Sequence, residues 1–402
     1  MKKQRLMTPG PTQVPDEARL ALARQIIHHR TPEFRGLLVE VLAGLQYVLA
    51  TQNDVVLLSC SGTGGMEAAV VNLVPRGGKA IVLESGKFAQ RWREIAERFG
   101  IEVVRLEVPW GEPFAAADVA RLLAEHPDAA AVYATLQETS TGVGHDIEAI
   151  GRVVAASRAL FVVDGISGVG VMECRTDAWG IDVLVVGAQK ALMTQPGLAF
   201  LAVSPAAWKQ IEAIPRPAFY FDLLAYRKGL AGAETPFTPA TALIVALAES
   251  LRMIRQQGIE AVWARGKLLA QAAREGLAAL GLKLVAARPA AGLTAAYLPD
   301  GVDGRAFLDR LEERFGVKLA GGQGPLKGRI FRLAHMGMLD ELEILSALAA
   351  IELVLVEMGQ NIKLGVSVGA ASRVLAQVNN HSLREPKPCQ ESSFWTNCRK
   401  TV

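Results

Sequence analysis

The sequence predicts an α/β protein with a mostly parallel sheet and a second, smaller α+β domain. Between about residues 54 and 203, short apolar runs alternate with amphipathic stretches, as is typical of parallel strands buried on both faces. The chain has 402 residues, of which 50% are hydrophobic, so it can bury a core large enough for two domains. After about residue 280, shorter strands mix with helices, which indicates the second domain.

The elements of the large sheet can be placed in order along the chain. Helical patterns lie between the apolar runs, which favours a sheet covered on both faces. In such sheets, ligands bind at the carboxyl ends of the strands. The predicted helices are residues 90–99, 115–125 and 146–156. The predicted strands are residues 55–59, 80–83, 103–106, 130–134, 160–163 and 183–186.

The C-terminal half begins with a long helical stretch, from about residue 240 to 280. Gly258 lies inside it and predicts a break into two helices. Further on, the predicted helices are 304–315 and 340–357, and the predicted strands are 282–286, 293–297, 317–320 and 330–334. We therefore expect four parts: an N-terminal arm (1–20), a large domain (21–257), a small C-terminal domain (258–378) and a disordered polar tail (379–402).

Composition argues against several functional classes. The net charge is only +3, basic residues are scattered and no acidic tail is present, so neither nucleic acid nor a cationic partner is expected. No window of about 18 uncharged apolar residues predicts a membrane span, and residues 1–12 lack the apolar stretch of a secretory signal. The cysteines form no CxxC pair and no zinc-like spacing with histidine, which predicts no metal site. We expect a cytoplasmic protein. The cysteines are Cys60, Cys174, Cys389 and Cys398.

A turn rich in glycine follows the first predicted strand, at residues 59–67 (SCSGTGGME). Small residues let the backbone approach a ligand closely, and free N–H groups at a helix start attract an anion. Ser61 and Thr63 add hydroxyl donors. The turn is therefore interpreted either as a phosphate cradle or as a tight strand-to-helix turn that binds nothing.

Two charged residues end buried strands further along the chain. Asp164 closes the strand in VVDG, where it serves as a helix cap, a metal ligand or a charge partner. Lys190 follows the apolar run VLVVGAQK, and a buried amine has a lowered pKa that makes it a nucleophile and a base. The alternative for Lys190 is a side chain that extends to the surface.

The combination of the three signals is more specific than any one of them. A phosphate turn, a strand-end aspartate and a strand-end lysine are the groups that pyridoxal phosphate needs. The lysine forms the covalent link to its aldehyde, and the aspartate keeps the pyridine nitrogen protonated so that the ring accepts electrons. The sequence therefore predicts a pyridoxal-phosphate enzyme with Lys190 and Asp164 as its catalytic residues.

Five ordered segments resemble one family, the class V (fold type I) pyridoxal-phosphate aminotransferases of the alanine–glyoxylate and serine–pyruvate type. The resemblance runs from TPGPT at residue 8 to about Gly337, through SGTGGMEAAVVNLV, LQETSTGV, VVDGISGVG and GAQKAL. It implies a fold type I architecture, with a large domain around a seven-stranded, mostly parallel sheet. It also implies a homodimer with shared active sites.

The resemblance assigns roles to individual positions. Lys190 is implied as the cofactor anchor and Asp164 as the partner of the ring nitrogen. Arg332, within a C-terminal strand, is implied as the clamp for the substrate carboxylate, and Gly10 of TPGPT as a further substrate contact; without the resemblance, a structural salt bridge also explains Arg332. The other implied cofactor ligands are Ser61, Gly62, Thr63 and Gln189 at the phosphate, Phe88 on the ring, Thr139 at the ring hydroxyl and Thr238 in the neighbouring subunit's site.

The expected reaction is transfer of an amino group from alanine or serine to glyoxylate or a similar 2-oxo acid, in two half-reactions with ping-pong kinetics. One alternative is a lyase of the cysteine-desulfurase type, for which Cys60 and Cys174 are the available thiols. Another is a non-catalytic subunit or binding protein on the same scaffold, since some relatives are described as hydrogenase-associated subunits.

Overall fold

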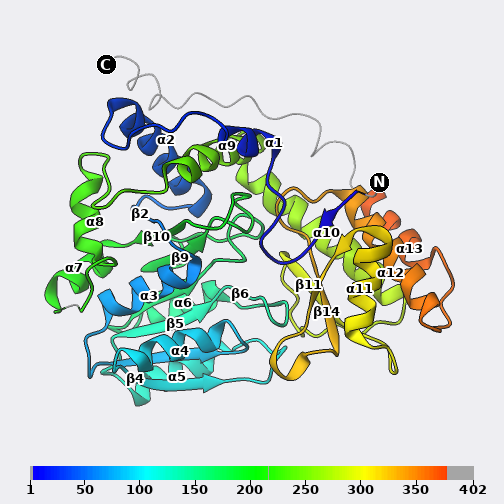
Figure 1. Ribbon diagram of the computed structural model, residues 1–402. Helices are drawn as coiled ribbons and strands as arrows, with labels where there is room; N and C mark the ends of the chain where they lie inside the picture. The colour runs from blue at the N-terminus through cyan, green and yellow to red at the C-terminus, as the bar shows by residue number, and fades with distance from the viewer. Residues whose placement is uncertain (1–2, 216, 378–402) are drawn as a thin grey trace.

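The computed structural model describes residues 3–215 and 217–377, so the predicted tail lies outside the described residues. A seven-stranded sheet forms the larger part of the molecule, with helices on both of its faces (Figure 1). The predicted α/β class with a mostly parallel sheet is confirmed. The strands are β2 (Asp54–Leu58), β3 (Lys79–Glu84), β4 (Glu102–Glu107), β5 (Ala131–Thr135), β8 (Leu160–Asp164), β9 (Val183–Gly187) and β10 (Ala199–Val203).

The strand order is β2-β10-β9-β8-β5-β3-β4. Four neighbouring pairs are parallel, from β9 through β8, β5 and β3 to β4. Only β10 runs antiparallel, and it pairs with both β2 and β9. The sequence pattern did not single out β10 as a strand. Because β10 is antiparallel to both of its neighbours, β2 and β9 run the same way, and the carboxyl ends of β2, β5, β8 and β9 share one edge.

Side chains of each strand alternate between two buried layers, as the pleat requires. In β2, Val55 and Leu57 pack into one core cluster, and Val56 and Leu58 pack into the other. The first cluster is covered by α2 (Pro32–Leu49), α5 (Ala116–Glu125), α6 (Ile147–Val154) and α9 (Thr241–Gln257). The second is covered by α3 (Gly62–Leu73), α4 (Ala89–Arg98), α7 (Pro205–Ala213) and α8 (Leu223–Leu230).

The predicted break at Gly258 is confirmed. Gly258 has a φ of +85°, a conformation that favours glycine, and it separates α9 from α10 (Ile259–Ala279). Helix α10 leads from the large sheet to the C-terminal elements (Figure 1). There it packs on a third core cluster, which includes Leu269 and Leu277.

The C-terminal elements form a three-stranded sheet and a group of helices, seen at the right of Figure 1. The strands, in the order in which they pair, are β11 (Leu293–Tyr297), β14 (Ile330–Ala334) and β13 (Ala320–Gly321). The helices are α11 (Gly304–Phe315), α12 (Glu341–Glu357), α13 (Val366–Ala376) and the short 3₁₀ helix Gly324–Leu326. Apolar side chains of α11, α12 and α13 fill the third cluster, whereas Leu326 of the 3₁₀ helix packs with Leu293 and Ile330 in a separate small cluster. The domain limits proposed from the sequence stay predictions.

Two predicted strands of this part are wrong. Residues 282–286 make one isolated bridge, between Leu284 and Ala296, because the following chain turns away to donate from Ala287 N–H to Gly111 O. Residues 317–320 are not one strand. They divide into β12 (Val317–Lys318) and the start of β13, which belong to different sheets.

The N-terminal arm is an integral part of the C-terminal layer. Its strand β1 (Arg5–Leu6) pairs in parallel with β12, and Met7 is fully buried in the third core cluster. The chain then crosses to α1 (Asp16–Ala21), which lies beside α9 (Figure 1). The arm therefore passes over the region between the two sheets. Over residues 3–215 and 217–377, no helix has the length and apolarity to cross a membrane.

Candidate active site

The sequence-predicted residues meet at the shared edge of the large sheet. The glycine-rich turn follows β2, Asp164 ends β8, and Lys190 follows β9 by three residues. The short hairpin of β6 (Gln137–Glu138) and β7 (Val143–Gly144) lies beyond β5 at the same edge. Thr135 of β5 pairs with Asp164, and Asp164 pairs with Val185 of β9, so these strand ends are immediate neighbours.

Lys190 is mostly buried at this edge. Its Nζ donates a hydrogen bond to Pro9 O. Burial lowers its pKa to about 8, with Asp164 acting in the opposite sense and the cations Arg332 and Arg91 adding to the decrease. A larger fraction of this amine is neutral near pH 8 than for an exposed lysine, which suits a nucleophile and a proton carrier.

The N-terminal arm covers Lys190. Gly10 has a φ of +115°, and a Cβ on it would fall 2.3 Å from the lysine Nζ. Thr12 fixes this contact, because its Oγ1 donates to Lys190 O (2.7 Å) and its N–H donates to Gln189 O (3.1 Å). The structure thus brings Gly10, a predicted substrate contact, directly against the predicted cofactor anchor.

Asp164 is a buried carboxyl with few donors. Its Oδ1 accepts from Ile166 N–H (2.8 Å). Burial raises its pKa to about 7, and this one hydrogen bond, with the charges of Arg91 and Lys190, only partly offsets the increase, to which Glu138 adds. A buried carboxyl short of donors is suited to pair with a protonated ring nitrogen.

The glycine-rich turn forms the start of α3, as its phosphate interpretation requires. Ser61 is the N-cap residue and its hydroxyl makes no capping hydrogen bond, so it is available to a ligand. Ser61 and Thr63 are exposed, whereas Gly62 is buried against Ile166. Nearby Gln189 has a buried Oε1 with no hydrogen-bond partner. Backbone donors at a helix start and the uncapped Ser61 hydroxyl fit a phosphate group.

Arg332 reaches the site from β14 of the C-terminal sheet. Its side chain donates from Nε to Gly321 O and from NH1 to Thr139 O, both at 2.9 Å. Burial lowers its pKa to about 10, and Glu138 acts in the opposite sense. No carboxylate of the described residues forms an ion pair with it, which disfavours the structural salt bridge. A buried guanidinium that binds only carbonyl oxygens is suited to hold a carboxylate.

The remaining predicted residues lie around this centre. Thr139 is buried, and its Oγ1 donates to Ser167 Oγ (2.7 Å). The Phe88 ring is half-buried and lies under the Arg91 guanidinium, 5.2 Å from the ring centroid. Thr238 is exposed, two residues before Ala240, whose N–H donates to Ser59 Oγ (2.9 Å). The roles proposed for these three residues stay predictions.

Three site residues were not singled out from the sequence. Arg91 donates to Thr63 Oγ1 (3.0 Å), Ser167 contacts Thr139, and Glu138 is a fully buried carboxylate that accepts from Ala89 N–H (2.9 Å). Arg91 lies three residues after Phe88, a spacing that places both on one face of a helix, so its position was within reach of the sequence. Glu138 and Ser167 gave no comparable signal.

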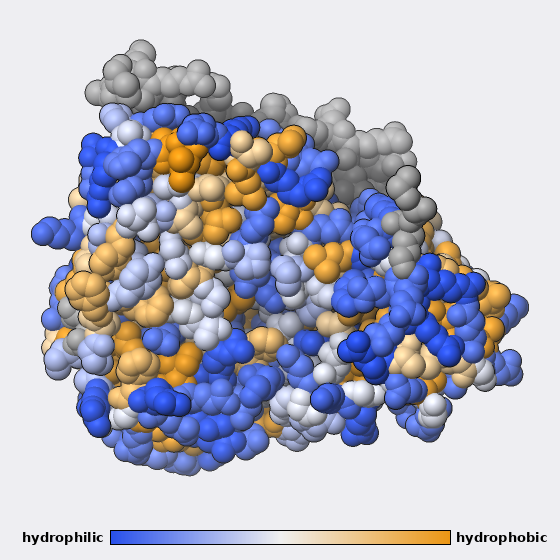
Figure 2. All heavy atoms as spheres, viewed as in Figure 1, coloured by the Kyte–Doolittle hydropathy of each residue, from blue (hydrophilic) through white to orange (hydrophobic). Residues whose placement is uncertain are grey.

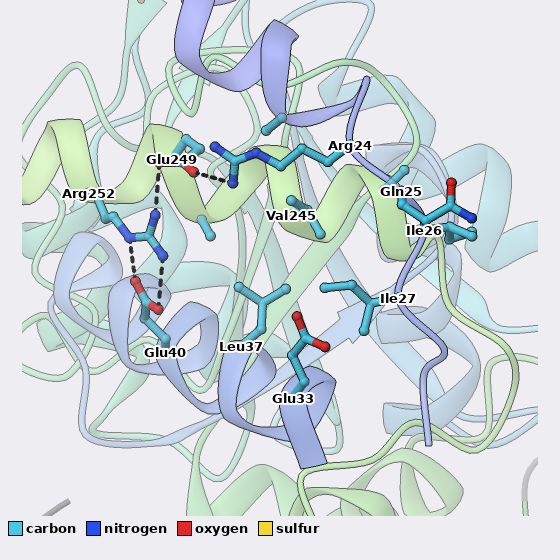
Figure 3. Close-up of a pocket in the computed structure, with 13 residues that line it drawn as sticks. Arg24, Gln25, Ile26, Ile27, Glu33, Leu37, Glu40, Val245, Glu249 and Arg252 are labelled. Carbon is cyan, nitrogen blue, oxygen red and sulfur yellow. Dashed lines mark hydrogen bonds and ion pairs between the residues drawn. The ribbon is translucent and has the colours of Figure 1, made fainter. Parts of the chain in front are cut away.

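A pocket of about 460 Å³ lies elsewhere, between α2, α9 and residues 24–27 (Figure 3). Arg252 binds both Glu40 and Glu249 along its wall, and Arg24 pairs with Glu249. None of the predicted cofactor or substrate residues lines it. We therefore place the chemistry at the sheet edge and not in this pocket.

The two cysteines of the described residues are poor candidates for a lyase nucleophile. Burial raises the pKa of the Cys60 thiol and of the Cys174 thiol to about 12. Cys174 is buried in the main core cluster, and Cys60 packs against the second cluster. A thiol nucleophile needs an accessible thiolate, so these environments disfavour the desulfurase alternative.

The fold and the sheet-edge site define an aminotransferase, and the chain belongs to the aminotransferase class-V family, whose model matches residues 17–335. Members of this family depend on pyridoxal phosphate. The chain is 42% identical to the soluble hydrogenase small subunit of Synechococcus sp. strain PCC 6716 (93% of this chain, 99% of that one). It is 37% identical to the L-aspartate–glyoxylate aminotransferase of Paracoccus denitrificans (91% and 94%). The crystal structure of ureidoglycine–glyoxylate aminotransferase from Bacillus subtilis superposes with a TM-score of 0.90 at 29% identity (94% and 99%).

Proposed function

We propose that this aminotransferase transfers the amino group of a small amino acid, alanine or serine, to glyoxylate or a similar 2-oxo acid. The observation that carries the proposal is the buried amine of Lys190, with a lowered pKa, beside the buried carboxyl of Asp164. Two relatives of this chain are named for glyoxylate, which supports it as the acceptor.

Pyridoxal 5'-phosphate is the cofactor that we propose for this edge. The start of α3, with Ser61, Gly62 and Thr63, would hold its phosphate, and Gln189 would donate to it from its side-chain N–H group. Arg91, which donates to Thr63 Oγ1, would add positive charge there. When bound, the cofactor supplies an aldehyde for the substrate amine and a ring that withdraws electrons from the substrate α-carbon.

The residues of the chain then divide the remaining work. The carboxylate of Asp164 holds a proton on the ring nitrogen. The Lys190 amine would take the proton from the substrate α-carbon and deliver it to the former aldehyde carbon of the cofactor, and in the second half-reaction it would carry a proton in the opposite direction. The Arg332 guanidinium binds the substrate carboxylate bidentately, which orients the α-hydrogen toward Lys190. The arm at Gly10 closes the site above the lysine and excludes water.

A donor–acceptor matrix tests this proposal. The purified protein with added pyridoxal phosphate is assayed with alanine, serine, aspartate and ureidoglycine as donors, against glyoxylate and pyruvate. We expect turnover with alanine or serine and glyoxylate, and none with Lys190→Ala. The exposed residue Lys327 provides a matched control, since Lys327→Ala should keep full activity. Turnover by Lys190→Ala, or no turnover with any pair, would reject the function.

A non-catalytic subunit is the second candidate, and the name of the Synechococcus relative, a soluble hydrogenase small subunit, favours it. The shifted pKa values of Asp164 and Lys190 argue for catalysis, since a binding protein has no need of them. Absorbance separates the two. A transaminase with bound cofactor is yellow and its spectrum changes when L-alanine or L-serine is added, whereas a pure binding protein stays colourless.

We further propose a homodimer that shares its active sites. Large apolar side chains are exposed on this part of the chain: Leu20 (68%) in α1, Val39 (50%) in α2 and Ile26 (69%), which lines the pocket of Figure 3. Figure 2 shows hydrophobic residues gathered over α1 and α2. Such patches are typical of surfaces covered by another chain. Sedimentation should give twice the 43.0 kDa chain mass, and Val39→Arg should shift it toward the monomer. The cytoplasmic location stays a prediction.

A further inference from the structure

Glu138 is a fully buried carboxylate at the centre of the site, and the reaction proposed above does not use it. Four donors satisfy its two oxygens. Oε2 accepts from Phe88 N–H (3.2 Å) and Ala89 N–H (2.9 Å). Oε1 accepts from Ser140 N–H (2.9 Å) and Ser140 Oγ–H (2.6 Å). The side chain thus joins two segments that lie about fifty residues apart in the sequence.

The two segments carry the residues proposed to face the cofactor. One begins α4 and holds Phe88. The other holds Thr139, whose backbone oxygen accepts from Arg332 NH1 (2.9 Å). The carboxylate lies at the start of α4, where the helix dipole favours negative charge. Gly86 leaves room for it, because a Cβ there would fall 2.7 Å from Glu138 Cδ.

Glu138 acts electrostatically on both halves of the site. None of the described lysines, arginines or histidines forms an ion pair with it, so its charge is held by neutral donors and reaches its neighbours. That charge raises the pKa of Arg332, against the larger lowering effect of burial. It also adds to the raised pKa of Asp164. The anion therefore favours a charged guanidinium and a protonated Asp164 carboxyl.

We propose that Glu138 is a positioning residue, which fixes the Phe88 and Thr139 segments against each other and so sets the carboxylate affinity of Arg332. This rests on the proposed function, because Phe88 and Arg332 have their roles only there. A neutral residue of the same shape cannot replace it. A glutamine would turn its N–H groups toward backbone N–H donors and would carry no charge.

Glu138→Gln tests this with two binding measurements on the apoenzyme: titration calorimetry with propionate, and absorbance titration with pyridoxal phosphate. We expect both affinities to fall about tenfold, the effect of one lost charge-assisted hydrogen bond. Glu352→Gln is the matched control. Glu352 is also buried, and it accepts from Gly365 N–H and Ser367 N–H (2.6 Å each) at the start of α13.

The two variants should lower Tm to a similar extent, and only Glu138→Gln should lose affinity. The proposal is overturned if folded Glu138→Gln binds both probes as the wild type does, or if Glu352→Gln loses as much affinity.

Ser140→Ala is the second test variant, for the case in which Glu138→Gln does not fold. It removes one of the four donors and keeps the charge, so we expect about threefold weaker cofactor binding and unchanged propionate binding. Wild-type cofactor affinity in Ser140→Ala would then reject the proposal.

The failure of this inference and the failure of the proposed function give different results. If the wild type binds neither propionate nor pyridoxal phosphate, the proposed function fails. If the wild type binds both and transaminates, while Glu138→Gln matches it, only the role of Glu138 is wrong.

Discussion

Asp164 and Lys190 lie at the edge of the large sheet, and Glu138 and Arg332 lie at its junction with the C-terminal sheet. The two pairs differ in the number of hydrogen bonds that their charged groups make. At the sheet edge, Asp164 accepts one backbone N–H, and the pKa values of Asp164 and Lys190 move to about 7 and about 8. At the junction, Glu138 accepts from four donors and Arg332 donates to two carbonyl oxygens.

This difference separates the residues suited to proton transfer from those that hold the shape of the site. Groups short of partners have pKa values close to neutral pH, so they can exchange protons during a reaction. A buried carboxylate that accepts from four donors holds the chain segments around it in place. We therefore expect substitutions at the sheet edge to lower kcat and those at the junction to raise KM.

The largest of the effects in this comparison is expected for Asp164→Asn. Asparagine keeps the hydrogen bond from Ile166 N–H and loses the charge that holds a proton on the ring nitrogen. We expect kcat to fall roughly 10³-fold with KM little changed. Asp182→Asn is the control: Asp182 is a partly buried aspartate just before β9, with hydrogen bonds from Phe161 N–H and Ser204 Oγ–H, and its loss should affect stability alone. Equal kcat losses in the two variants would contradict the assignment.

Arg332→Gln tests the junction. The variant loses the bidentate site for the substrate carboxylate, so we expect KM for the amino donor to rise roughly 10²-fold, with a smaller change in kcat. Steady-state kinetics in the donor concentration measure both. Arg265 is a matched control, because it is also largely buried and donates to two carbonyl oxygens, Gly337 O and Leu339 O. A KM as low as that of the wild type would refute the clamp.

Gly10→Ala tests the contact between the arm and Lys190. The added Cβ would lie 2.3 Å from the lysine Nζ, so the arm must shift and we expect cofactor affinity to fall about tenfold. Gly301→Ala separates backbone strain from this contact, since Gly301 also has a positive φ, +80°, and no atom lies within 4 Å of its added Cβ. If Gly10→Ala binds pyridoxal phosphate as tightly as Gly301→Ala does, the arm does not set the lysine's position.

The smallest expected effect is a pH dependence of cofactor capture. Only the neutral Lys190 amine attacks the aldehyde, and its pKa is lowered to about 8. The neutral fraction therefore grows as pH rises, and the capture rate of the apoenzyme should increase about fivefold from pH 7 to pH 8 and level off above pH 9. Stopped-flow absorbance measures it. A midpoint above pH 10 would mean that burial does not activate this lysine.

Local sequence patterns were sufficient for most of the fold. The strands around Asp164 and Lys190 could be predicted because their residues are apolar without interruption and alternate with amphipathic helical stretches, as is typical of a sheet buried on both faces. The break at Gly258 was predictable for a similarly local reason. Strand β10 was not predicted, because its sequence, AFLAV, resembles a buried helix segment as much as a strand. The strand predicted at 282–286 was wrong because the chain turns away at Ala287, whose N–H donates to Gly111 O. Gly111 is distant in the sequence, so no local pattern predicts this hydrogen bond.

The sequence by itself predicted that a lysine, an aspartate and a glycine-rich turn meet at one edge of the sheet, because each of them follows a strand with an uninterrupted apolar pattern. Only the tertiary structure decided the placement of Arg332 against Thr139, of Gly10 against Lys190 and of Glu138 between two distant segments. The reason is physical. Strand ends follow from periodicity, whereas contacts between sheets depend on how separate elements pack, and that packing is a property of the whole chain.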